Sequence, residues 1–145
     1  MEQKVQPLSP DDTARLEKQR LWVRDHHDPS ALDRYQSVEG KLRLLEIILE
    51  RGGIGRSETW KLQSLGVFFG DALAQHLQLS WIMVEDEYDR DPALEVPSTT
   101  IKIFPLTMIS KRVEDGEAVN VQDLFVETCS TIDRLKIELS GQMRH

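Results

Sequence analysis

The sequence predicts one α+β domain over residues 1–145, with N-terminal helices, a small antiparallel sheet and a C-terminal helix that closes the fold. Three observations predict this order. Apolar residues recur at helical spacing in three segments before the sheet, two runs of strand-forming residues follow near 81–87 and 99–104, and helical spacing returns over 121–139. The chain has 145 residues, 39% of them hydrophobic, which suits one domain with one core.

The first helix is expected to begin after Ser9 and to run to about Arg24. The Ser9 hydroxyl can cap the helix, and Pro10 suits its first position. The two aspartates that follow favour the positive end of the helix dipole. The polar segment from Asp25 to Pro29 then ends this helix.

Two more helices are expected before the sheet. Ser30 can cap the second, along which apolar residues recur every three or four positions until Gly52 and Gly53 end it. Ser57 can cap the third, whose apolar face continues to Leu77.

Gly66 and Gly70 lie four residues apart in the third helix, and therefore on one face. In a lipid-facing helix this spacing would indicate dimerisation. The polar residues Asp71, Gln75 and His76 follow in the same helix. We therefore expect the missing side chains to allow close packing against a neighbouring element in the core.

The sheet is expected to contain two paired strands. Residues 81–84 form an uninterrupted apolar run, which predicts a central strand buried on both faces. Residues 99–104 alternate and are expected to pair with it, until Pro105 ends the strand. An acidic connector separates the two strands. Residues 106–112 fit either a third short strand or a helical turn.

The closing helix is predicted by one apolar stripe. Its members are Val121, Leu124, Phe125, Thr128, Ile132, Leu135 and Leu139. Cys129 lies beside Phe125 on this stripe, where a free cysteine behaves as a small buried hydrophobic residue.

Charge and composition narrow the class of partner and the compartment. The formal net charge of −7 disfavours nucleic acid and anionic membranes, and it suits a protein partner with a basic surface. The single cysteine rules out an intrachain disulfide, which fits a reducing compartment. The N-terminus lacks the apolar core of a signal peptide, and no apolar stretch approaches the roughly 20 residues of a membrane span. We expect a cytoplasmic protein, and the sequence does not determine its oligomeric state.

The segment from Glu85 to Asp91 is the main candidate site. It carries five carboxylates, which only Arg90 offsets locally. In an extended strand, side chains alternate, so four of the acids would point to one side. These four are Glu85, Glu87, Asp89 and Asp91. Such a row could bind a basic partner with Tyr88 as the aromatic anchor, hold a metal, imitate a strip of phosphates, or be a solvated loop in which Arg90 forms surface ion pairs.

Known catalytic and metal motifs are absent from the sequence. An EF-hand beginning at Glu87 fails because Pro92 replaces the turn glycine and Ser98 the closing glutamate. HExxH, GxSxG, GxGxxG and the phosphate-binding loop do not occur. The adjacent residues His26 and His27 alone do not build a metal site. We expect no cofactor, no bound metal and no catalytic residue.

The central third of the chain carries a family resemblance. The segments that carry it are LQSLGVFFGDAL (62–73), WIMVEDEY (81–88), RDPAL (90–94) and FPLTMISKR (104–112). Over about 62–116 the chain resembles DUF3806, a bacterial family of unknown function. The resemblance implies a bacterial cytoplasmic protein and makes the acidic segment part of the family's characteristic block. It implies no chemistry.

These observations favour a non-enzymatic protein-binding module whose site comprises Glu85, Glu87, Tyr88, Asp89, Arg90 and Asp91. Its partner is expected to be a protein with a basic surface. Small acidic bacterial proteins of this kind are similar in type to immunity proteins that neutralise toxins. The alternatives are a metal-dependent hydrolase that uses the carboxylates of 85–91, and an assembly or structural subunit.

Overall fold

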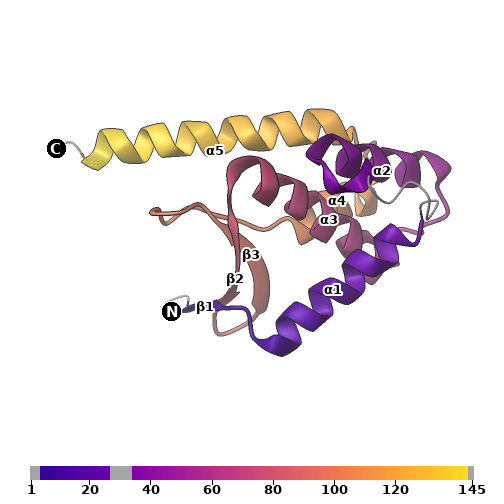
Figure 1. Ribbon diagram of the computed structural model, residues 1–145, viewed down its shortest axis with the longest axis horizontal. Coiled ribbons are helices and arrows are strands. Elements are labelled where there is room, and N and C mark those ends of the chain that lie inside the picture. Colours follow the sequence, from indigo (N-terminus) through magenta and orange to yellow (C-terminus); the bar gives the residue numbers. More distant parts are fainter. Residues whose placement is uncertain (1–3, 27–33, 144–145) are drawn as a thin grey trace.

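The computed structural model describes residues 4–26 and 34–143. Its helices and four-stranded antiparallel sheet confirm the predicted α+β class (Figure 1). In chain order the elements are β1 (Lys4–Pro7), α1 (Pro10–Arg24), α2 (Val38–Arg51), α3 (Thr59–Leu77), β2 (Ser80–Glu85), β3 (Arg90–Glu95), β4 (Lys102–Ile103), α4 (Leu106–Glu114) and α5 (Val121–Met143).

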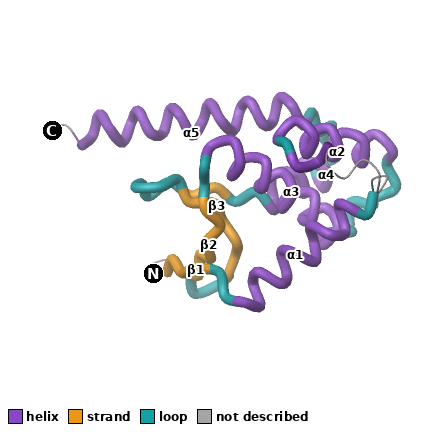
Figure 2. Tube along the Cα trace, viewed as in Figure 1, coloured by secondary structure: helices purple, strands orange, loops and turns teal. Residues whose placement is uncertain are grey.

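The sheet has the strand order β1-β2-β3-β4. Figure 2 labels β1, β2 and β3. β2 pairs with both β1 and β3, so the prediction of a central strand is confirmed. Met83 and Val84 are buried as predicted, but Trp81 and Ile82 are only partly buried. The prediction that 99–104 pairs with β2 is wrong, because β3 comes from the acidic connector and takes that place. Pro92 is tolerated in β3 because β4 pairs only with Leu94 and Glu95, which leaves Pro92 on a stretch of β3 that β4 does not reach.

The first helix begins and ends where the sequence predicts. The Ser9 hydroxyl accepts a hydrogen bond from the Asp12 amide (3.1 Å), and the Asp12 carboxylate accepts one from the Ser9 amide (2.9 Å). This reciprocal capping box satisfies two amides that the helix itself cannot pair. The local sequence therefore determines where α1 begins.

The starts of the next helices differ from expectation. α2 is capped by Ser37, whose hydroxyl accepts from the Gly40 amide, while Ser30 lies outside the described residues. The expectation that Ser57 caps α3 is wrong. Glu58 takes the N-cap position, and its carboxylate turns back to accept from the Gly55 amide (3.1 Å). Gly52 ends α2 at a φ of 67°, as predicted.

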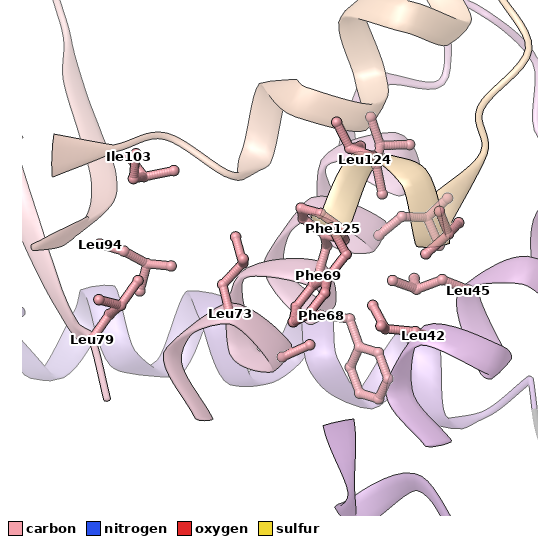
Figure 3. Packing of buried hydrophobic residues seen from close by; sticks show 14 of the residues in the cluster. Leu42, Leu45, Phe68, Phe69, Leu73, Leu79, Leu94, Ile103, Leu124 and Phe125 are labelled. Atoms are coloured by element: carbon pink, nitrogen blue, oxygen red, sulfur yellow. The ribbon is translucent and has the colours of Figure 1, made fainter. Parts of the chain in front are cut away.

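The core surrounds α3, which contacts α1, α2, α4 and α5. Phe68 and Phe69 lie at its centre, and the ring of Phe69 meets that of Phe125 edge-on at 6.1 Å (Figure 3). The predicted stripe on α5 is confirmed: Ile132 is fully buried, and Leu135 and Leu139 beyond it are partly buried and pack against the core. Cys129 is partly buried and packs against this cluster, as expected. Residues 106–112 belong to α4, so of the two alternatives for this segment, a short strand or a helical turn, the structure has the helix.

The two glycines of α3 confirm the predicted close packing. A Cβ atom on Gly66 would lie 2.6 Å from the Pro105 carbonyl oxygen and from the Leu106 Cα atom. A Cβ atom on Gly70 would lie 2.7 Å from the Trp81 ring. Gly66 therefore lets the start of α4 lie directly against α3, and Gly70 does the same for the Trp81 side chain of β2.

Gly66→Ala is expected to lower the free energy of unfolding by about 2–3 kcal/mol, because the rigid backbone at Leu106 would have to move. Urea denaturation measures this difference. The matched control is Gly141→Ala on α5, where the added methyl meets open space, and about 0.5 kcal/mol of added stability is expected. Equal stability of the Gly66→Ala variant and the unmodified protein would contradict the packing.

Gln19→Met is expected to raise the free energy of unfolding by about 1 kcal/mol. The Gln19 side chain is 0% exposed, and neither amide atom has a hydrogen-bond partner within the described residues. Burying an unpaired amide is costly, and Met has a similar volume without this penalty. Thermal and urea unfolding test the difference against Lys18→Met, an exposed change on the same helix. A fall in stability would contradict the prediction.

Candidate functional site

The acidic segment is a tight β-hairpin. β2 and β3 are joined by residues 86–89, with the Asp86 amide donating to the Asp89 carbonyl oxygen (2.9 Å). The Asp86 carboxylate accepts from the amides of Tyr88 and Asp89, both at 2.8 Å. These backbone hydrogen bonds lower the pKa of Asp86. The Asp86 side chain therefore stabilises the turn itself.

The predicted row of four acids is wrong. Glu85 lies opposite Arg90, and Val84 lies opposite Asp91. Because directly opposed residues share a face of the sheet and successive residues alternate, Glu85 and Asp91 project from opposite faces. The row assumed one extended strand, but the turn at 86–89 reverses the chain inside the segment.

Among the described residues, Arg90 forms its ion pair with Asp12 of α1 and with none of the hairpin acids. Its guanidinium makes a two-pronged contact with Asp12 of α1, with Nη1–Oδ1 at 2.6 Å and Nη2–Oδ2 at 2.7 Å. The Asp12 side chain is only 9% exposed, and the hydrogen bonds from Arg90 hold the pKa of that carboxyl well below its usual range. The pair anchors the hairpin to the capped start of α1.

Glu85 is also occupied within the fold, since its carboxylate accepts from Gln6 Nε2 of β1 at 2.8 Å. Of the six predicted site residues, Glu85 and Arg90 thus hold the sheet and α1 together. The structure brings the other four to the exposed surface around the turn. They are Glu87, Tyr88, Asp89 and Asp91.

Glu87, Tyr88 and Asp89 form what we name the hairpin tip. The Tyr88 side chain is 83% exposed. In the described part of the chain, none of these three side chains makes a hydrogen bond or an ion pair. Partial loss of solvent, and then the charge of Asp89, raise the pKa of the neighbouring Asp91. The tip therefore presents an aromatic ring among free negative charges on a turn that the protein holds in place.

The carboxylates do not converge on a common point. Within the ranges 4–26 and 34–143, no group of three or more His, Cys, Asp or Glu side chains could hold a metal ion. The ring of His26 packs against Trp22 at 4.4 Å, and its Nδ1 hydrogen-bonds the Trp22 carbonyl oxygen. His27 lies outside the described residues. The carboxylates of 85–91 that the hydrolase alternative would use are therefore not gathered into a metal-binding group in the described part of the chain.

The sequence interpretation did not identify a partly buried polar network. Arg20 of α1 contacts Asp71 of α3 through two bonds of 2.6 and 2.9 Å, and the Trp81 indole of β2 donates to the same carboxylate at 3.0 Å. Arg20 and Asp71 are each 16% exposed. The sequence signal for this network is Asp71, a charged residue next to Gly70. A charged residue alone does not identify its partners elsewhere in the chain.

Comparisons with known proteins agree with this fold. A family model described as a domain of unknown function (DUF3806) matches residues 41–125, which confirms the resemblance over the central region. A crystal structure of a protein from Bacteroides thetaiotaomicron VPI-5482 is similar in fold, with a TM-score of 0.72 and 14% identity. The match covers 89% of this chain and 48% of that chain, so this chain spans about half the length of that protein. No curated protein matches the sequence significantly.

None of the described helices has both the length and the apolar character that a membrane span requires.

Asp12→Asn is expected to change the pH dependence of stability. The pKa of Asp12 is lower in the folded chain than its ordinary value of about 4. Its contribution is therefore fully present above about pH 4 and is lost as the pH falls below that value. Because Asn can still accept from the Ser9 amide, the substitution removes mainly the pairing with Arg90.

The variant should be less stable than the unmodified protein at pH 7, and the gap should narrow below about pH 4. Urea denaturation at a series of pH values measures it. Asp11→Asn, an exposed acid in the same helical turn, is the control and should have the smaller effect. A gap for Asp12→Asn that stays constant with pH would contradict the assignment.

Proposed function

The chain belongs to the DUF3806 family, a domain of unknown function, and from its own geometry we propose that it is a non-enzymatic protein-binding module. One observation carries this proposal. Tyr88, a large aromatic side chain, is 83% exposed at the end of a hairpin that is held in place at both sides. Asp86 stabilises the turn, and Arg90 anchors the following strand to α1.

A fixed aromatic residue is a good anchor for binding. Tyr offers a large contact area with few rotatable bonds, so little side-chain entropy is lost when it is buried in an interface. The backbone of the turn is already ordered by the Asp86 carboxylate, so binding does not need to order it. Tyrosines in such positions are frequent among residues that dominate binding energy.

The charges around Tyr88 define the partner's chemistry. Glu87, Asp89 and Asp91 lie exposed beside it, and the whole chain carries a net charge of −7. Such a surface attracts a basic one, both in long-range steering and in the final contact. We therefore propose a partner protein with a basic patch that contains a pocket for the Tyr88 ring. In its most specific form, the module is a cytoplasmic immunity protein that neutralises a bacterial toxin.

Tyr88→Ala is expected to weaken partner binding by about 30-fold or more, the loss typical of a residue at the centre of an interface. The partner is first recovered with the unmodified chain from an extract of its native cell, including strains that carry neighbouring toxin genes. Its affinity for both chains is then measured by calorimetry. Rising salt should weaken binding, because charge pairs are screened.

The control is Ile137→Ala on α5, which removes another exposed large apolar residue (72% exposed). It should leave the affinity unchanged within about twofold. Two results would overturn the proposal: no stoichiometric partner is recovered, or a partner is recovered whose affinity does not respond to Tyr88→Ala.

A further inference from the structure

A second surface lies away from the hairpin tip. An open groove of about 610 Å³ is bordered by the C-terminal end of α2, the segment that leads into α3, and the connection from α4 to α5. In Figure 1, α2 and α4 lie at the opposite end of the molecule from β1 and the β2–β3 turn. The groove therefore cannot be part of the contact proposed for the tip.

The floor of the groove is apolar. Ile48 and Leu62 are buried beneath it, whereas Leu49, Ile54, Val113 and Val119 are partly exposed along it. The volume lies within the range of roughly 300–1,000 Å³ that is typical of binding pockets. Apolar side chains of a ligand that entered the groove would be removed from water against this floor. Such burial of apolar surface is the main driving force for association.

The groove's border is acidic. Glu46, Glu50 and Glu117 line it, and the lining residues that the structure describes include no Lys, Arg or His. Arg43 lies behind this border, 3.7 Å from Glu46 and 3.6 Å from Glu50. Arg43 is 58% exposed, so these are surface pairs that contribute little. The Arg56 guanidinium lies beside Gly116, next to Glu117, so two arginines face three glutamates and the border keeps a net negative charge.

Helix ends add to the same potential. α2 ends at the groove, where Gly52 is part of the lining, and α4 ends beside it. The C-terminal end of a helix carries a partial negative charge. α5 begins at the groove with the opposite sign, but the Asn120 side chain already accepts from the Asp123 amide there (3.0 Å). The helix ends therefore favour a cation more than an anion.

We propose that this groove binds a peptide segment of a partner protein in which one or two apolar side chains are flanked by Lys or Arg. The apolar floor takes the apolar side chains, and Glu50 and Glu117 pair with the flanking cations. Because the groove is open along the surface, an extended or helical segment can lie across it. This binding does not depend on the hairpin tip.

The test uses three short synthetic peptides and two-dimensional amide NMR spectra of the full chain. One peptide alternates Leu with Lys, the second alternates Leu with Glu, and the third alternates Ser with Lys. The first is expected to shift the amides of residues 46–54 and 113–121, because it matches both the floor and the border. The second lacks the cations and the third lacks the apolar side chains, so both should bind much more weakly.

Two double variants make the test specific. Glu50→Gln with Glu117→Gln should weaken the Leu–Lys peptide by about fivefold, the effect of losing two exposed charge pairs. Glu127→Gln with Glu138→Gln makes the same charge change on exposed positions of α5 and should leave the affinity unchanged. Shifts centred on 85–91, equal binding of the Leu–Glu peptide, or an equal response to the two double variants would each overturn the groove, without deciding the role of the tip.

Discussion

The arrangement of the elements depends on the hydrogen bonds that the Asp71 carboxylate accepts. It accepts two hydrogen bonds from Arg20 and one from the Trp81 indole, so a single side chain joins α1, α3 and β2. Gly70 makes this possible, because only a residue without a side chain lets the Trp81 ring lie against α3. Such a desolvated pair is stable only while both charges are present, and losing either would leave the other without compensation.

A second ion pair, between Asp12 and Arg90, attaches the hairpin to α1. α1 buries few apolar residues, chiefly Leu16 and Val23, yet it lies fixed against the domain. Its other attachments are Arg20 to Asp71 near its end and Asp12 to Arg90 at its start. Because Asp12 also caps α1, the start of the helix and the position of β3 are tied to one side chain. The Asp12–Arg90 pair therefore attaches the hairpin to the start of α1.

The acids of the hairpin differ in role although they are neighbours in sequence. Asp86 closes the turn, and Glu85 binds Gln6 of β1, so both acids have a role within the fold. Glu87 and Asp89 remain free on either side of Tyr88. This division concentrates the available charge around one aromatic ring instead of spreading it along a row. Other acids, Glu46, Glu50 and Glu117, line the apolar groove at the other end of the molecule.

Local patterns in the sequence determined the α+β class, the capped start of α1 at Ser9, the close approach at Gly66 and the apolar stripe of α5. Each depends on residues within a few positions of one another, so spacing and capping chemistry suffice. Only the tertiary structure decided the pairing of β1 with β2, the reversal inside the acidic segment and the partner of Arg90. The strand pairing and the Arg90 contact join groups as far apart along the chain as Lys4 and Glu85, and these contacts follow from packing that no local pattern encodes. The reversal is a local turn at 86–89, but the sheet that it serves forms only when β2 pairs with β3.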